Sequence, residues 1–177
     1  MLKIALVGAG KMGLSHLAIL GAHPELDVVA VCDSTGYLLS ALRKHTGITT
    51  YKTPRKLFDS EDLDAVLVAT PTATHFEIAS EALNRGVAVF MEKPLCLDPK
   101  DSCALRDLAR RLNLPCQVGY HNRFLGTFRE AKRLLDSGAL GSVHHVSGTA
   151  FGPVVTKKKS GSTWRSKKSE GGGCLHD

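Results

Sequence analysis

The sequence lacks the cysteine pattern of a disulfide framework or a structural zinc site. Its five cysteines are an odd number, and no two of them form a C-x-x-C pair. It also has no apolar stretch long enough to span a bilayer, and no charged-then-apolar signal peptide with a cleavage site. We therefore expect a cytoplasmic protein with reduced cysteines, no metal site and no membrane partner.

Acidic side chains are missing from one stretch, residues 157–168, which carries six lysines or arginines. These six account for the whole formal net charge of +6, so the rest of the chain is near neutral. The basicity is local, and it does not indicate that the domain as a whole binds nucleic acid. We expect no nucleic-acid partner. The run is either a solvated loop or a contact for an anionic substrate such as a nucleotide sugar.

The chain of 177 residues is 43% hydrophobic and 23% charged, which is ordinary for a globular protein with one domain and some chain left over. Apolar runs alternate with helix-periodic segments six times up to about residue 119. The runs are residues 4–7, 27–33, 48–51, 64–69, 87–91 and 115–119. The intervening segments include a single helical turn at 54–58 and helices at 74–84 and 98–112. This rhythm predicts an α/β fold, a doubly wound and mostly parallel sheet.

The strongest local motif joins the first strand to the first helix. Residues 2–13 read LKIALVGAGKMG, so the glycine turn has the spacing G-x-G-x-x-G, formed by Gly8, Gly10 and Gly13 with Lys11 and Met12 between the last two. The three glycines allow a tight turn, close backbone approach to a pyrophosphate, and close packing of helix on strand. A βα turn without a ligand is the alternative. The context between strand and helix favours a dinucleotide site.

Asp33 ends the second strand, twenty residues after Gly13. A carboxylate at that place can accept hydrogen bonds from a ribose 2′-hydroxyl and would repel a 2′-phosphate. It could instead cap the next helix. No arginine follows it, since Ser34 and Thr35 come next, and this favours NAD over NADP.

The rhythm of strand and helix stops after residue 122. A further helix is predicted at 124–137, and a segment of strand character follows at 142–151. We therefore place a dinucleotide-binding domain at residues 1–122, and a linker helix with the incomplete start of a second α+β domain at residues 123–177. Polar residues follow several strands of the first domain, where ligands of doubly wound sheets bind.

These motifs, in order, resemble the Gfo/Idh/MocA oxidoreductases, the family of glucose–fructose oxidoreductase and inositol dehydrogenase. The matching segments are VGAGKMG, Asp33, ATPTATH at 69–75, MEKP at 91–94, GYHNRF at 119–124, and TWR followed by SEGGGCLHD. The resemblance implies a Rossmann domain followed by an antiparallel-sheet domain, and hydride transfer between a nicotinamide cofactor and a carbon of a sugar or cyclitol.

The resemblance also implies roles for single residues. Lys93 would bind the reacting hydroxyl and assist proton transfer, with a bond to Pro94 that is often cis. A solvated lysine or a phosphate contact is the alternative. Glu92 would lie near the cofactor ribose. Thr70, Pro71 and His75 match a loop over the adenosine half of the cofactor, although His75 could equally make a hydrogen bond at the helix start.

The remaining carried-over residues lie in the last third of the chain. Asn122 matches a cofactor contact, and Arg123 matches a substrate contact or is solvated. Trp164 and Arg165 match a segment that can touch the cofactor. Asp177 aligns with a catalytic-site Asp, which the family follows four residues later with a His that this chain lacks.

We therefore expect a fragment of a longer enzyme rather than a natural truncation. The predicted function is that of an NAD-dependent oxidoreductase of sugars, sugar derivatives or cyclitols, homo-oligomeric as the full-length protein. A non-catalytic NAD-binding module that acts through a partner is the alternative.

Overall fold

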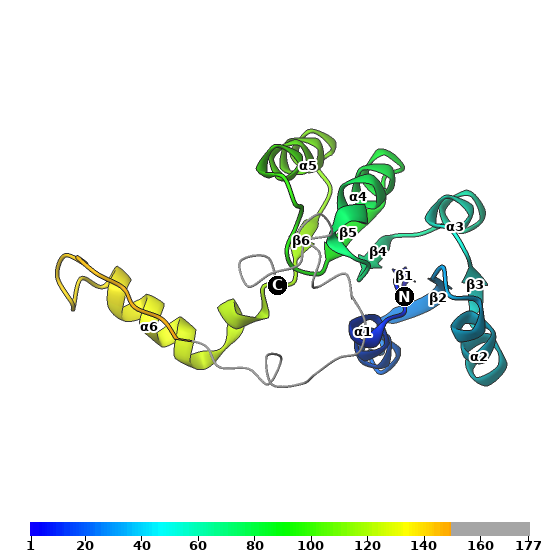
Figure 1. Ribbon diagram of the computed structural model, residues 1–177, viewed down its shortest axis with the longest axis horizontal. Coiled ribbons are helices and arrows are strands. Elements are labelled where there is room, and N and C mark those ends of the chain that lie inside the picture. The colour runs from blue at the N-terminus through cyan, green and yellow to red at the C-terminus, as the bar shows by residue number, and fades with distance from the viewer. Residues whose placement is uncertain (150–177) are drawn as a thin grey trace, which may run out of the picture. The chain divides into compact units, whose positions relative to one another are not determined.

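The computed structural model describes residues 1–149. Six strands form one parallel sheet in the order β3-β2-β1-β4-β5-β6 (Figure 1). The strands are β1 (Leu2–Val7), β2 (Leu26–Cys32), β3 (Thr49–Tyr51), β4 (Ala65–Val68), β5 (Ala88–Met91) and β6 (Cys116–Val118). The predicted α/β doubly wound fold is confirmed.

Helices cover both faces of this sheet. The helices α1 (Lys11–Gly21) and α2 (Gly36–Thr46) lie on one face, and α3 (Pro54–Ser60), α4 (His75–Asn84) and α5 (Pro99–Leu112) lie on the other (Figure 1). A short 3-10 turn, η1 (Thr72–Thr74), precedes α4. The chain leaves β1 toward one face and β4 toward the other. A crevice is therefore expected where the carboxyl ends of these two neighbouring strands meet.

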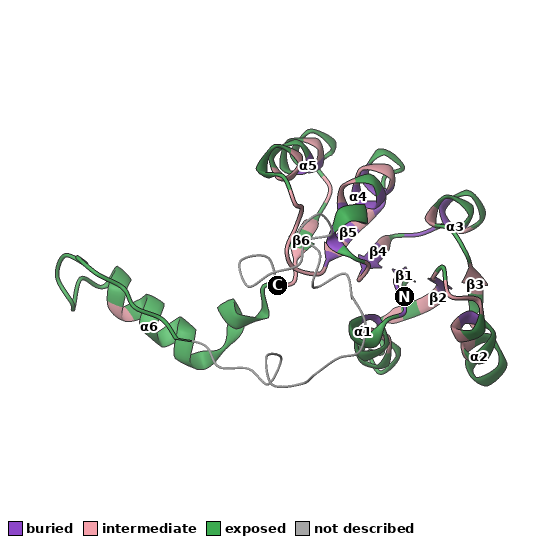
Figure 2. Cartoon of the chain, viewed as in Figure 1, coloured by how far each residue is buried: buried purple, intermediate pink, exposed green. Residues whose placement is uncertain are grey.

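The four central strands, β2, β1, β4 and β5, contain unbroken apolar runs because both faces of the sheet are buried there. Leu6 and Val31 pack into the core under α1 and α2, whereas their neighbours Val7 and Cys32 pack into the core under α3, α4 and α5. Figure 2 shows the buried residues gathered on the strands and on the inner sides of these helices.

The helix at α3 is longer than the single turn predicted from the sequence. Thr53 accepts a hydrogen bond from the backbone N–H of Lys56, and Pro54 occupies the first turn, where its missing N–H costs nothing. Leu57 and Phe58 are buried in the core. Tertiary burial therefore extends a segment whose own sequence signal is short.

A second compact unit begins at Tyr120, whereas the first contains Met1–Gly119. In the second unit, η2 (His121–Phe124) and α6 (Gly126–Asp136) are separated by Leu125, whose backbone is extended. The strand expected from residue 142 is wrong for residues 142–149, which have no regular secondary structure. A strand needs a neighbour, and none of the described strands pairs there. The division at residue 122 stays a prediction.

No helix within residues 1–149 is long and apolar enough to cross a membrane.

The cysteines of the first unit differ in how far they are buried, and this predicts a difference in reactivity. Burial is the main cause that raises the pKa of the Cys32 thiol to about 12, and the nearby Asp33 carboxylate adds to it. At pH 8 this thiol is therefore protonated and unreactive, while Cys103 is exposed. We expect iodoacetamide at pH 8 to modify Cys103 at least about 100-fold faster than Cys32. Peptide mass spectrometry would measure both rates, and equal rates in the folded protein would contradict the buried position of Cys32.

Candidate functional site

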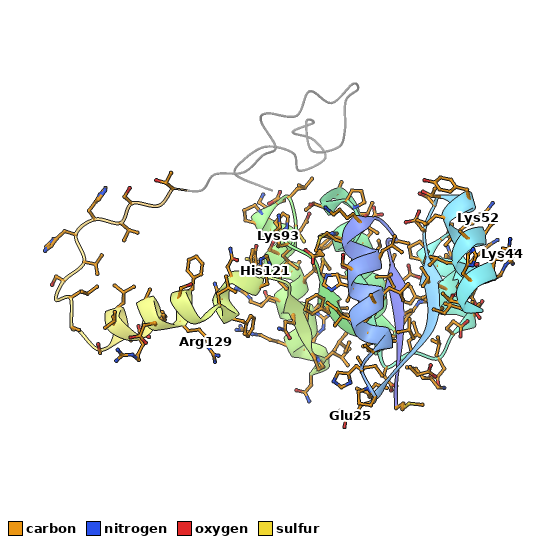
Figure 3. The ribbon with its side chains drawn as sticks, turned by 90° about the horizontal axis from the view of Figure 1, so that it is seen from below. Glu25, Lys44, Lys52, Lys93, His121 and Arg129 are labelled. Atoms are coloured by element: carbon orange, nitrogen blue, oxygen red, sulfur yellow. The ribbon has the colours of Figure 1, made fainter. Side chains whose placement is uncertain are left out.

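The carboxyl ends of the strands carry the candidate site. Figure 3 shows Lys52, after β3, and Lys93, after β5, at the carboxyl ends of the strands, and Glu25, before β2, at their amino ends. A cavity of about 690 Å³ opens at the carboxyl ends. Seven residues predicted to bind the cofactor line it: Gly8, Gly10, Lys11, Met12, Asp33, Thr70 and Pro71. The structure therefore brings three separate sequence motifs to one groove, which we call the cofactor groove.

Gly8 passes between the ends of two strands. Its N–H donates to the carbonyl of Cys32 (2.8 Å), and its φ of +96° lies in the region that only glycine adopts readily. A Cβ atom at Gly8 would lie 2.6 Å from the backbone carbon and oxygen of Ala69. The turn therefore needs glycine for both its conformation and its space.

Gly10 and Gly13 have opposite surroundings. Gly10 is the N-cap of α1, is exposed, and has nothing within 4 Å of a Cβ position, so the backbone is open to the groove. No side chain caps the first N–H groups of α1, which leaves them available to an anion. Gly13 is buried, and a Cβ there would lie 1.9 Å from the carbonyl oxygen of Gly8. Helix and turn are therefore in direct backbone contact.

Asp33 accepts two backbone hydrogen bonds in the structure, and its role toward a ribose stays a prediction. Its Oδ2 accepts from the Ala9 N–H (2.7 Å) and its Oδ1 from the N–H of Thr35 (2.7 Å), the N-cap of α2. The carboxylate thus braces the glycine turn and the start of α2. It also lines the cofactor groove, where each oxygen retains a second lone pair for a ribose hydroxyl.

Replacing this carboxylate by an amide gives a test of cofactor selectivity. We expect Asp33→Asn to raise the affinity for NADPH relative to NADH by about tenfold, because a negative charge that repels a 2′-phosphate is removed. Fluorescence titration with each dinucleotide measures the ratio. Asp27→Asn is the matched control, since Asp27 lies exposed at the other end of β2. An unchanged ratio for Asp33→Asn would contradict the ribose role.

Lys93 follows β5 directly and is half-buried. The N–H of Glu92 continues the β4–β5 ladder by donating to the Val68 carbonyl (2.9 Å), and the N–H of Lys93 donates to Glu92 Oε2 (3.2 Å). The Lys93–Pro94 peptide bond is cis, as the resemblance implies. Lys93 therefore stands at the groove edge of the sheet, on a segment fixed to the strand before it.

The structure gives His75 an internal place. Its side chain is 1% exposed, and each ring nitrogen faces backbone carbonyl oxygens. The ring does not line the cofactor groove, although Thr70, one of its partners, does. The hydrogen-bond alternative therefore describes its observed contacts. They reach across the fold, however, and go beyond the helix start.

Sequence reasoning missed three residues near the site. Lys52 and Thr35 line the cofactor groove, and His16 of α1 contacts Glu92, with 2.6 Å between Nε2 and Oε1. Each lies one to three residues past a strand or inside a helix, where no motif marks it. The spacing of His16, three residues after Gly13, was the one available signal, but its partner is 76 positions away.

The predicted residues from Asn122 onward are not among those that line the cofactor groove within the described part of the chain. Asn122 and Arg123 lie exposed in η2 of the second unit, where they line a cavity together with residues of α6 such as Phe128 and Arg129. Trp164, Arg165 and Asp177 lie outside the described residues, as does the basic segment 157–168. The roles of these residues stay predictions.

The cofactor groove fits a dinucleotide. Its described lining has two lysines, Lys11 and Lys52, and one carboxylate, Asp33, so its charge favours an anion. The turn between Gly8 and Gly13 has no space for a side chain at either end and an open backbone at Gly10. Backbone N–H groups, a helix N-terminus and an acid at the end of β2 are the elements that hold NAD in a Rossmann domain.

Comparison with known proteins agrees with this geometry. Residues 2–120 match the family described as "Oxidoreductase family, NAD-binding Rossmann fold", and residues 128–177 match the "GFO/IDH/MocA C-terminal domain". One relative, inositol 2-dehydrogenase 4 of Saccharopolyspora erythraea, is 39% identical over 150 residues, which cover 79% of this chain and 42% of that protein. The chain spans about half the length of the curated relatives it matches.

Solved structures give the same result. The NAD-binding protein from Listeria innocua is similar with a TM-score of 0.77 and 29% identity, over 99% of this chain and 51% of the other. The scyllo-inositol dehydrogenase from Lactobacillus casei, solved with NAD(H) and scyllo-inositol, has a TM-score of 0.72 and 28% identity, over 80% and 42%. With its groove, its EKP segment and these matches, the chain belongs to the Gfo/Idh/MocA oxidoreductase family, and its Rossmann domain is of the NAD-binding type.

Proposed function

We propose that the protein to which this chain belongs is an NAD-dependent dehydrogenase acting on a hydroxyl-bearing carbon of a sugar, sugar derivative or cyclitol. One observation carries the proposal: Lys93 is half-buried directly after β5, at the same sheet edge as a groove shaped for a dinucleotide (Figure 3). A lysine beside a cofactor can hold and move the proton of a substrate hydroxyl.

The residues of the chain have distinct tasks in this reaction. Gly8, Gly10 and the start of α1 would hold the pyrophosphate, and Asp33 the adenosine ribose. When bound, the nicotinamide ring supplies the hydride acceptor or donor at its C4. Lys93 takes the hydroxyl proton at Nζ as the carbon loses its hydride, and it returns that proton in the reverse direction. As Nζ gains that proton, the positive charge that forms on it stabilises the oxygen, on which negative charge develops.

We also propose a role for Glu92 beside the cofactor ribose. Its side chain is 14% exposed and its Oε2 accepts from the N–H of Lys93. A carboxylate in this place can orient a ribose hydroxyl by accepting its hydrogen bond. Arg123 and Asn122 are proposed to contact the substrate and the cofactor, and Asp177 to assist Lys93.

The substrate class rests on the relatives. They are named as dehydrogenases of inositols and of a D-glucoside, and one solved structure holds scyllo-inositol. These names support a polyhydroxylated ring as substrate, and they do not favour the non-catalytic module. A homo-oligomer remains our prediction for the complete protein.

A substrate screen on the complete protein tests the proposal. Reduction of NAD⁺ is followed at 340 nm with inositols, glucosides, sugar acids and nucleotide sugars, each repeated with NADP⁺. We expect turnover with at least one ring polyol, and faster with NAD⁺. Tight NADH binding without turnover of any of these compounds would support the non-catalytic module and overturn the proposed reaction.

A further inference from the structure

Two histidines from different helices hold the segment Glu92–Leu95 on either side of Lys93. The first is His16 of α1, whose Nε2 lies 2.6 Å from Glu92 Oε1. The side chains of His16 and Glu92 are only 20% and 14% exposed, and the imidazole stands edge-on to the ring of Phe90 in β5. This contact therefore fixes the residue immediately before Lys93.

The second histidine is His75, the first residue of α4. Its Nδ1 lies 3.0 Å from the carbonyl oxygen of Pro94 and 3.2 Å from that of Leu95. Its Nε2 lies 3.0 Å from the carbonyl oxygen of Thr70. Carbonyl oxygens only accept, so His75 hydrogen-bonds to them through whichever ring nitrogen carries hydrogen, and a side chain without N–H cannot replace it. Only a ring protonated on both nitrogens would bond to both sides at once. This contact fixes the two residues after Lys93.

Both histidines are also connected to the cofactor groove. His16 lies on the helix that begins at the glycine turn, six residues or about 1.7 turns after Gly10. The partner of His75, Thr70, lines the groove itself. The segment that carries Lys93 is thus tied to the groove at two places, through α1 before the lysine and through the Thr70 loop after it.

We infer that His16 and His75 are positioning residues, which hold Lys93 in a fixed place relative to the cofactor groove. Neither imidazole has to touch substrate or cofactor for this task. Each hydrogen bond closes a loop between segments distant in sequence, by 76 positions for His16 and by 19 for His75 with Pro94. Without them the segment after β5 would open locally while the sheet beneath it stays intact. We call these contacts, of His16 with Glu92 and of His75 with Pro94 and Leu95, the histidine bracket. Its role in catalysis rests on the function proposed for Lys93, whereas its role in holding the segment does not.

The reactivity of Lys93 in the ligand-free chain measures the bracket. An N-hydroxysuccinimide ester acetylates lysines, and peptide mass spectrometry gives the rate at each one. Lys44 of α2 and Lys52 serve as internal controls, since both lie well apart from Lys93 (Figure 3). We expect His16→Leu and His75→Leu to raise the acetylation rate at Lys93 about fivefold and to leave the rates at Lys44 and Lys52 unchanged. His16→Gln and His75→Gln retain an N–H donor and should restore part of the protection.

A third histidine supplies the matched control. His23 is exposed beyond α1, where its Nδ1 accepts from the Glu25 N–H, and His23→Leu should leave every rate as it was. If His75→Leu does not fold, the partly exposed His16 still gives the answer. An unchanged rate at Lys93 in folded His16→Leu overturns the inference, as does an equal rise at all three lysines, which would indicate loosening of the whole domain.

NADH separates this inference from the proposed function. If Lys93 lies beside the bound cofactor, saturating NADH slows its acetylation in the wild-type chain. Absence of that protection counts against the proposed site of Lys93. The change between wild type and His16→Leu without NADH tests the bracket alone. In the complete enzyme, the histidine variants should lower kcat by about tenfold and leave the affinity for NADH within about twofold, which a general loss of stability would not do.

Discussion

Gly13→Ala should abolish detectable NADH binding and lower the free energy of unfolding by about 3 kcal/mol. The added Cβ would lie 1.9 Å from the carbonyl oxygen of Gly8 and 2.9 Å from its carbonyl carbon. Both atoms belong to backbone that is itself fixed, because the Gly8 N–H bonds to Cys32. The clash therefore moves α1 away from β1 and opens the turn that would hold the pyrophosphate.

The same helix offers a matched control for this prediction. Gly21 is the last residue of α1, and a Cβ there meets nothing within 4 Å. Gly21→Ala should be neutral or stabilise by up to about 1 kcal/mol, since alanine favours helix more than glycine does. Urea unfolding and NADH fluorescence compare the two variants. Equal stability and equal affinity for both would show that the contact of α1 with the turn is not essential.

The main features of the fold could be predicted because their causes are local in the sequence. The central strands β2, β1, β4 and β5 contain continuous apolar runs, and two helices have a side-chain cap in their own sequence: Thr53 accepts from the Lys56 N–H before α3, and Asp98 from the Lys100 N–H before α5. The glycine turn is likewise local, since Gly8, Gly10 and Gly13 act within one βα unit. Its place in the groove follows from strand order, which the alternation of strand and helix already restricts.

The contacts that complete the site could not be predicted because they join distant segments. His16 contacts Glu92 only because the fold brings α1 close to the end of β5, where its ring also meets Phe90. Nothing in the sequence of either segment predicts this contact. The buried His75 gave no sign that its carbonyl partners lie in two loops. The strand predicted at residues 142–149 was wrong for a related reason, because strand propensity without a neighbouring strand does not determine a strand.

Replacement of Lys93 in the complete enzyme should have the largest effect on turnover. Lys93→Met removes the nitrogen that takes the hydroxyl proton, and we expect kcat to fall about 10³-fold while the affinity for NADH stays within about threefold. The glycine turn and Asp33, which line the cofactor groove, are untouched by this change. Lys44→Met, on the exposed side of α2, is the control and should leave kcat unchanged.

An arginine at the same position distinguishes the two tasks given to Lys93. Arginine keeps a positive charge near the developing oxyanion, but it cannot be deprotonated in a protein and so cannot take the proton. If proton transfer is the main task, Lys93→Arg falls as far as Lys93→Met. If charge is the main task, Lys93→Arg retains much of the turnover. A Lys93→Met enzyme that keeps its full rate on the substrate found in the screen would exclude both tasks, and would leave the lysine as a contact of the cofactor alone.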